Sequence, residues 1–219
     1  MRTRTLALLL IGASTVLLDG QARPASDIHE QSLTRLPPVQ RADLTDEGKR
    51  IWDDLAGAGK TMPATGPAPL SMYSPNAAAP IHALNQFLRT TVVGPRFFEL
   101  SALIAAREFD QQYEWSGHEP AALRAGLEQP VIDVVKFNRD VAGLSEKDAT
   151  VIRLGRAVFR DHKVSPAVWA KTVELFGRQG AVEITMIMGD YAMAAIMLTA
   201  VDQQLPPTRP ALLPALPAR

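Results

Sequence analysis

Glu114, His118 and Glu99 are the residues of this sequence whose types and spacing best suit chemistry. Glu114 and His118 are four positions apart, so in a helix their side chains lie one turn apart on the same face. That face continues through small side chains that leave space beside the two polar groups: Ala121, Ala122 and Ala125. A carboxylate and an imidazole beside such a space suit proton transfer. If Glu99 reaches it from the preceding helix, the site has both an acid and a base.

Each of these residues also has an interpretation that involves no chemistry. Glu99 lies among apolar residues, where burial would favour its protonated form as a general acid requires. Near a helix N-terminus, it could instead simply be stabilised by the helix dipole. Glu114 and His118 could form a surface ion pair that contributes only a few tenths of a kcal/mol. The sequence leaves these alternatives open.

Four further residues are candidates for substrate binding: Trp115, Arg96, Arg107 and His82. Trp115 could form a wall of the pocket, although an aromatic residue in this position more often anchors its helix in the core. Arg96, Arg107 and also Arg124 are near enough in sequence for one of them to meet a substrate carboxylate. His82 could line the same pocket, or it could be a hydrogen-bonded structural histidine.

Two glutamates and a histidine could also hold a metal ion in a carboxylate-rich site. The paired histidines of the zinc-protease motif and an obvious fourth ligand are both missing, so we predict no metal and no other cofactor. The chain also contains no cysteine. Thiolate metal sites, thiol redox chemistry and cysteine nucleophiles are therefore excluded.

The composition is that of an ordinary globular protein. The 219 residues are 47% hydrophobic and 21% charged, and their formal net charge is zero. A nucleic-acid partner usually requires an excess of positive charge, and a disordered chain has few apolar residues; neither applies here. We therefore expect one folded domain that acts on a small molecule and binds no nucleic acid.

The N-terminus has the pattern of a secretory signal peptide over residues 1–22. Arg2 and Arg4 precede an apolar run from Leu6 to Leu18, and Gly20-Gln21-Ala22 offers small residues for cleavage. The run is short for a membrane span, although an uncleaved anchor is the alternative. We expect a periplasmic or secreted protein that has no membrane segment once the signal is cleaved, and an N-terminal extension over residues 23–45.

The remaining chain is predicted to be all-α, with a helical domain over residues 46–205 and a proline-rich tail over 206–219. The tail is expected to be an extended arm or disordered, and Gly57–Pro69 is a loop that could cover the site. The apolar stretch from Ile184 to Val201 is better explained as a central buried helix than as a membrane span, because charged residues interrupt it. Helices are expected at Asp46–Ala56, Pro80–Thr90, Arg96–Phe109, 110–125, Pro130–Asn138, Ser145–Arg160, Ser165–Gly177 and Ala181–Gln203.

Three methionines of the last helix share one stripe: Met186, Met193 and Met197. Methionine is flexible and fills irregular spaces between helices. A stripe of this kind is more often part of a core than of a cofactor site. We therefore expect these side chains to fill the core.

From about Gly94 to Leu205 the chain resembles the carboxymuconolactone decarboxylase family, which includes the alkylhydroperoxidase D-like proteins. The run Tyr113-Glu114-Trp115 followed by His118, together with the spacing from Glu99 to His118, is the most specific part of the resemblance. The other matching positions are Arg96, Gly126-Leu127, Gly143-Leu144-Ser145, Phe176-Gly177, Gly189, Tyr191 and Met193. The resemblance implies an all-α bundle that assembles into trimers or hexamers, with Glu99, Glu114 and His118 as site residues.

The peroxidase branch of the family has two cysteines, seven and four positions before the histidine. Gln111 and Glu114 occupy those positions here, so thiol peroxidase activity does not carry over. The decarboxylase branch releases carbon dioxide from a carboxylated unsaturated lactone such as 4-carboxymuconolactone. The resemblance therefore implies a cofactor-independent lyase that uses His118 or a neutral glutamate as the proton donor.

The predicted export of this chain differs from the decarboxylase branch, whose pathway is normally cytoplasmic. The substrate could therefore be another small lactone, enol or carbonyl acid. The alternative function is a non-catalytic protein that binds a small ligand or supports assembly on the same scaffold. The sequence does not distinguish which glutamate acts as an acid and which orients His118.

Overall fold

The computed structural model describes residues 27–216, and the predicted signal peptide lies outside this range. The described chain is all-α, as the sequence predicted, and contains no β-strand, only an isolated bridge between His29 and Thr34. A short 3-10 helix, Arg41–Asp43, comes first, and a single turn of π-helix, Ala157–Asp161, follows α7. The α-helices are α1 (Asp46–Ala56), α2 (Pro67–Ser71), α3 (Pro75–Leu88), α4 (Gly94–Glu108), α5 (Gln112–Arg124), α6 (Gln129–Lys136), α7 (Glu146–Arg156) and α8 (Pro166–Ala200).

Side-chain caps and prolines mark where several helices begin. The hydroxyl oxygens of Thr45, Ser145 and Ser165 accept hydrogen bonds from the backbone N–H groups three residues later, so they cap α1, α7 and α8. The start predicted for α3 is wrong, because Pro75 occupies its first turn and Pro80 lies inside the helix. Proline suits a first turn because it has no N–H group to leave unpaired there.

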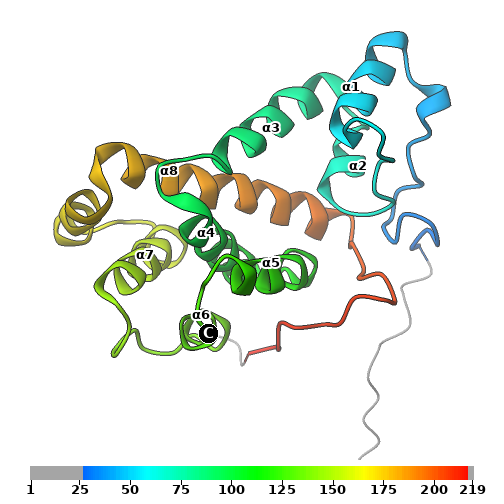
Figure 1. The fold of residues 1–219 in the computed structure, drawn as a ribbon. Coiled ribbons are helices and arrows are strands. Elements are labelled where there is room, and N and C mark those ends of the chain that lie inside the picture. Colours follow the sequence, from blue (N-terminus) through cyan, green and yellow to red (C-terminus); the bar gives the residue numbers. More distant parts are fainter. Residues whose placement is uncertain (1–26, 217–219) are drawn as a thin grey trace, which may run out of the picture.

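α8 runs through the middle of the molecule, with α3 on one side and α4 and α7 on the other (Figure 1). The sequence predicted two helices here, the first ending at Gly177. The structure has one helical run that is kinked at Gly177, whose φ of 70° and ψ of 171° are not helical. Glycine adopts this positive φ without the steric cost that a side chain would add. The break at Gly177 was therefore correctly placed, although it bends the helical run rather than separating two helices with a loop.

The main core lies where α4, α6, α7 and α8 meet. Its fully buried members include Leu103, Ile132, Leu154 and Ile184, one from each of these helices. α7 approaches α4 closely at Gly155, where an added Cβ would lie 2.4 Å from a methyl carbon of Ile104. This packing fixes where α4 lies, and α4 in turn positions Glu99 of the site.

By length and composition α8 could cross a membrane, but half of its most apolar stretch is buried inside the protein. Four large apolar side chains of α8 are nevertheless exposed, namely Trp169, Val182, Met186 and Ile196. The expectation that the methionine stripe fills the core is wrong. Met186 is exposed, and Met193 and Met197 line a cavity that is described below.

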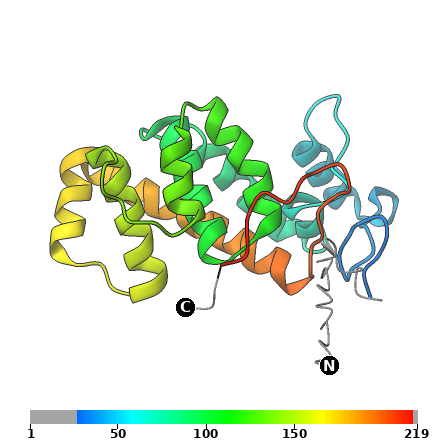
Figure 2. The same ribbon diagram turned by 90° about the horizontal axis from the view of Figure 1, so that it is seen from below.

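Residues 206–216 of the proline-rich tail run back from α8 along α5 (Figure 2). The backbone N–H groups of Leu212 and Leu213 donate to the side-chain oxygen of Gln112, at 3.0 and 2.8 Å. The Gln112 side-chain nitrogen donates in return to the carbonyl oxygen of Leu213, at 2.9 Å. Leu213 is buried in the main core. These bonds make the tail an integral part of the folded unit.

Candidate active site

The structure brings together the three side chains that the sequence analysis selected. Glu99 lies in the second turn of α4, and Glu114 and His118 lie on the facing side of α5. The Nδ1 atom of His118 is 2.7 Å from Oε2 of Glu99, and its Nε2 atom is 3.5 Å from Oε2 of Glu114. The imidazole ring is thus held between two carboxylates, one from each helix.

Burial decides between the alternatives that the sequence left open. Glu99 and Glu114 are only 7% and 5% exposed, so Glu114 and His118 do not form a surface ion pair. Glu99 is paired directly with an imidazole, so the helix dipole is not its only partner. One oxygen of Glu114, Oε1, is buried without a hydrogen-bond partner among the described residues. A buried carboxylate oxygen in this state is costly, unless a ligand or water satisfies it.

The two carboxylates determine the charge of His118. Burial by itself lowers the pKa of the imidazole, but the hydrogen bonds with Glu114 and Glu99 outweigh that effect and raise the pKa to about 9. His118 is therefore an imidazolium at neutral pH. It carries a proton on each ring nitrogen, and the proton on Nε2 faces the longer of its two contacts.

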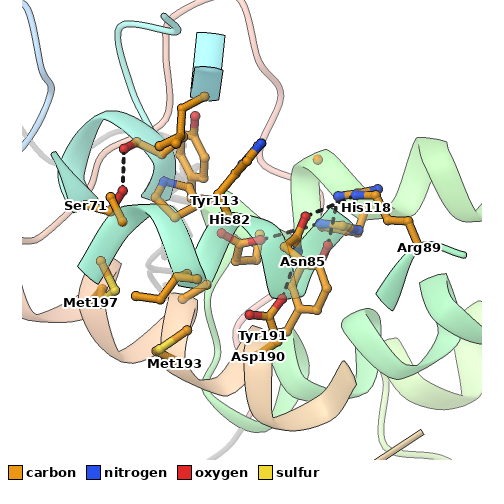
Figure 3. Close-up of a pocket in the computed structure, with 18 of the residues that line it drawn as sticks. Ser71, His82, Asn85, Arg89, Tyr113, His118, Asp190, Tyr191, Met193 and Met197 are labelled. Carbon is orange, nitrogen blue, oxygen red and sulfur yellow. Dashed lines mark hydrogen bonds and ion pairs between the residues drawn. The ribbon is translucent and has the colours of Figure 1, made fainter. Parts of the chain in front are cut away.

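These residues form part of the wall of a cavity of about 390 Å³, which is large enough for a small organic molecule. α2, α3, α5, α8 and the tail contribute to the lining, and Figure 3 shows side chains from several of these segments pointing toward one another. Ala121 continues the face of Glu114 and His118 into the cavity, as predicted, whereas Ala122 is buried in the main core. The apolar part of the wall includes Ile81, Met193 and Met197.

A second polar network lines the cavity beside His118 (Figure 3). The amide nitrogen of Asn85 donates to Oδ2 of Asp190 at 2.8 Å, and Arg89 donates to the Asn85 oxygen and to the Tyr191 hydroxyl, both at 3.1 Å. The ring of Tyr191 packs edge-on against the His118 ring, with centroids 4.5 Å apart. Burial raises the pKa of the Tyr191 phenol, which keeps this group neutral.

The carboxyl group of Asp190 shares this environment. Burial raises its pKa, the hydrogen bond from Asn85 lowers it, and the negative charge of Glu114 raises it further. Sequence reasoning did not assign Asp190, Asn85 or Arg89 to the site. The available signal was Asp190 itself, a carboxylate in the middle of an apolar helix. Nothing in the sequence around Arg89 indicated that α3 would bring it to the same cavity.

Trp115 does not line the cavity, so the suggestion that it forms a pocket wall is wrong. Its side chain is fully buried in the main core, and its indole N–H donates to Glu119. One helical turn separates Trp115 from Glu119, so the pair lies on a different face of α5 from Glu114 and His118. His82, in contrast, does line the cavity, from α3.

The arginines selected from the sequence also lie elsewhere. Arg96 forms ion pairs with Asp148 and Glu128. Arg107 is buried and donates to backbone carbonyl oxygens of Lys136 and Pro214. Both guanidinium groups join segments of the fold, and neither they nor Arg124 line the cavity. The arginines that do line it are Arg89 and Arg209, which come from distant parts of the sequence.

Residues 27–216 contain no group of three or more histidine or acidic side chains that could hold a metal ion. His118 in particular has a carboxylate on each side of its ring. Both ring nitrogens face carboxylate oxygens, and a protonated nitrogen has no lone pair for a metal. An imidazole between two carboxylates can donate or accept a proton.

Comparison with known proteins identifies the fold but no activity. No protein-family model matches the chain, and neither does any curated protein. A crystal structure from Agrobacterium tumefaciens is similar, with a TM-score of 0.56 and 18% sequence identity over 62% of this chain and 94% of the other. That protein is described as a protein of unknown function, with a suggested assignment as the antioxidant defence protein AhpD. The likeness shows that this chain has an AhpD-like all-α fold.

Proposed function

We propose that this protein is a cofactor-independent lyase that decarboxylates a small carboxylated unsaturated lactone, such as 4-carboxymuconolactone or a related acid. One observation carries the proposal: a buried imidazolium, held between two buried carboxylates, faces a cavity of about 390 Å³. An acid with a pKa of about 9 remains protonated at neutral pH, so it is available to donate a proton to carbon. Because the chain has no cysteine, the peroxide chemistry of thiol enzymes is excluded.

The proposed reaction needs no external electron sink. When the bond between the ring carbon and the carboxylate breaks, carbon dioxide leaves and the electron pair moves into the unsaturated lactone, whose carbonyl oxygen becomes an enolate. His118 then donates one proton to carbon, and a proton from solvent restores the imidazolium. One proton is thus consumed for each carbon dioxide released.

The two contacts of His118 suggest separate roles for the glutamates. Glu99 is at 2.7 Å from Nδ1, so it is suited to orient the ring. The contact between Nε2 and Glu114 is longer, at 3.5 Å, so the Nε2 proton can be redirected to a substrate more easily. We therefore assign Nε2 as the donor atom, Glu99 as the orienting residue, and Glu114 as the group that keeps the ring protonated.

A non-catalytic ligand-binding protein is the second candidate, and the unpartnered oxygen of Glu114 favours it equally. A buried acceptor without a partner is satisfied by any ligand that offers a hydrogen-bond donor, whether or not the ligand reacts. Tight binding without turnover, unaffected by pH through the range in which His118 titrates, would support this alternative.

A homo-oligomer, a trimer or hexamer, is part of the proposal. The exposed side chains of Val182, Met186 and Ile196 lie at helical spacing on one face of α8, and Met193 of the cavity wall lies on the same stripe. An exposed apolar stripe of this kind is typical of an interface. Light scattering at micromolar concentration tests this, and a monomer would contradict it. We also propose a periplasmic or secreted location, which N-terminal sequencing of the mature protein tests.

The deciding experiment is an assay of purified protein against a panel of carboxylated unsaturated lactones, with carbon dioxide release as the measurement. Wild-type protein should release carbon dioxide from at least one of them, and Glu114→Gln should not. Glu47→Gln is the matched control, because Glu47 is exposed on α1 and lies outside the cavity. Equal turnover by the Glu114→Gln variant would contradict the proposed site.

A further inference from the structure

The C-terminal tail contributes a charged side chain to the cavity wall. Arg209 lines the cavity together with residues of α5 and α8, although it follows the end of α8 by nine positions. Its guanidinium forms no ion pair with any acidic side chain among residues 27–216. Its recorded contacts are a 3.5 Å hydrogen bond to the carbonyl oxygen of Tyr113 and stacking over the Tyr113 ring, 4.4 Å from its centroid.

Arg209 is held in place from both sides. Its backbone N–H donates to the carbonyl oxygen of Pro206 at 2.8 Å, which forms a turn in the tail. Three residues later, the Gln112 side chain binds the backbone of Leu212. Tyr113, on which the guanidinium stacks, is itself fixed by a 2.9 Å hydrogen bond between its hydroxyl group and Thr65. The position of this cation is therefore prepared before any ligand arrives.

Arg209 also lies next to the acid–base residues. Tyr113 and Gly117 form one stripe of α5, and Glu114 and His118 form the adjacent stripe. Gly117 lines the cavity, and a Cβ atom added to it would lie 3.9 Å from Nη1 of Arg209. The guanidinium thus covers the residue that precedes His118. A ligand group bound by Arg209 would lie beside the imidazolium.

The acidic side chains of the cavity and Arg89 each contact at least one other side chain of the cavity. Glu99 and Glu114 face His118, Asp190 accepts a hydrogen bond from Asn85, and Arg89 donates to Asn85 and to Tyr191. Neither cavity arginine forms an ion pair within residues 27–216, but Arg89 donates to two side chains, whereas the guanidinium of Arg209 donates only to a backbone carbonyl at 3.5 Å. A guanidinium offers several N–H donors in a planar fork that matches the two oxygens of a carboxylate.

We propose that Arg209 binds a carboxylate group of the ligand, so that the C-terminal tail is part of the binding site. The inference rests on the proposed function and makes it more specific. Pairing with a guanidinium stabilises a carboxylate and would oppose its loss as neutral carbon dioxide. Arg209 therefore holds a carboxylate that the product keeps, while a second carboxylate on the substrate is the one released.

The test is a binding measurement with a charged and a neutral form of one unsaturated lactone, coumalate and its methyl ester. Calorimetry or ligand-observed NMR gives the dissociation constants for wild type, Arg209→Gln, Arg209→Lys and Arg124→Gln. Wild type should bind the acid at least about tenfold more tightly than the ester. Arg209→Gln should weaken binding of the acid by about 10- to 100-fold and change that of the ester less than about twofold.

Two controls make the result specific. Arg124→Gln removes an exposed arginine of α5 outside the cavity and should behave as wild type, whereas Arg209→Lys should retain part of the preference for the acid. Wild-type binding of the acid, but not of the ester, should weaken as salt is added. This measurement needs no variant, so it remains valid even if a substitution disturbs the tail.

Three results would overturn the inference. Wild type could bind acid and ester equally tightly, Arg209→Gln could keep the full preference for the acid, or Arg209→Gln could lose affinity for acid and ester to the same extent. Measuring carbon dioxide release distinguishes a failure of this inference from a failure of the proposed function. Carbon dioxide release that is unchanged in Arg209→Gln overturns the inference and leaves the lyase standing. Arg209-dependent binding of the acid without any turnover supports the inference and contradicts the lyase.

Discussion

Two carboxylates of α5, Glu114 and Glu119, are buried to almost the same degree but differ in how completely they are hydrogen-bonded. Both oxygens of Glu119 accept hydrogen bonds from Lys136 at 2.9 Å, and one of them also accepts the indole N–H of Trp115. Glu114 has one oxygen beside His118 and the other without a hydrogen-bond partner within residues 27–216. Glu119 faces the core and Glu114 faces the cavity.

The comparison shows that burial of a charge does not by itself indicate chemistry. A carboxylate whose acceptor positions are all occupied by its own protein is a structural group. A carboxylate with a vacant acceptor position beside a cavity can respond to a ligand. The following predictions test whether this distinction holds, from the largest expected effect to the smallest.

Replacing His118 should have the largest effect. His118→Gln removes the proton donor, and loss of a general acid typically lowers kcat by about 100- to 10,000-fold. The rate of carbon dioxide release is the measurement. The matched control is His162→Asn, because His162 is exposed after α7 and has a positive φ of 50°, which asparagine tolerates. Turnover that survives in His118→Gln would place the chemistry elsewhere.

The same substitution at Glu119 and at Glu114 should separate stability from activity. Glu119→Gln leaves Lys136 without its anion and should lower the free energy of unfolding by about 3 kcal/mol. Glu114→Gln removes one of the two carboxylates that stabilise the His118 charge but leaves Glu99 at 2.7 Å, so it should lower the free energy of unfolding by only about 1.5 kcal/mol, while reducing turnover by no more than His118→Gln does. Urea unfolding measures the free energy of unfolding, and carbon dioxide release measures turnover. Equal destabilisation by both variants would remove the distinction between the two carboxylates.

The stability of the protein should decrease as the pH rises from about 6.5 to about 9. The folded protein holds the pKa of His118 at about 9, above the value of 6.5 for the unfolded chain, so the folded state binds the proton more tightly. The stabilisation is therefore complete below pH 6.5 and is lost as the pH rises through 9. Its size is on the order of 3 kcal/mol.

Urea unfolding at several pH values, compared between wild type and His118→Gln, measures this effect. The variant lacks the titrating imidazole, so its stability should change less over the same range. Turnover by wild type should be constant near pH 7 and fall above about pH 9, where His118 loses its proton. A wild-type stability that increases between pH 6.5 and 9 would contradict the charge assigned to His118.

Trp115→Phe should have the smallest effect on activity. The indole N–H binds Glu119 and the ring lies in the core, so its loss should destabilise the protein by about 1–2 kcal/mol and change turnover less than about twofold. Thermal unfolding and the carbon dioxide assay measure the two effects. A large loss of turnover without a change in stability would place Trp115 in the binding site after all.

Residues that are close in sequence were the most predictable part of the site. The spacing of Glu114 and His118 places both on one face of any helix, and Glu99 on the preceding helix could reach them across a short connection. The helical class and most helix starts followed from caps, prolines and glycines. Pro75 and Pro80 show the limit of such signals, because both suit a first turn and only packing determines which one begins the helix.

The sequence by itself therefore determined the all-α class, the absence of thiol chemistry and the shared face of Glu114 and His118, because these depend on composition and on the period of a helix. Only the tertiary structure decided which arginines line the cavity. Arg96 and Arg107 lie near the site in sequence but pair with Asp148 and with backbone carbonyls, whereas Arg209 reaches the cavity from the tail. An arginine side chain is long and binds whichever acceptor the packing of distant segments brings near. The local periodicity of the sequence does not predict that packing.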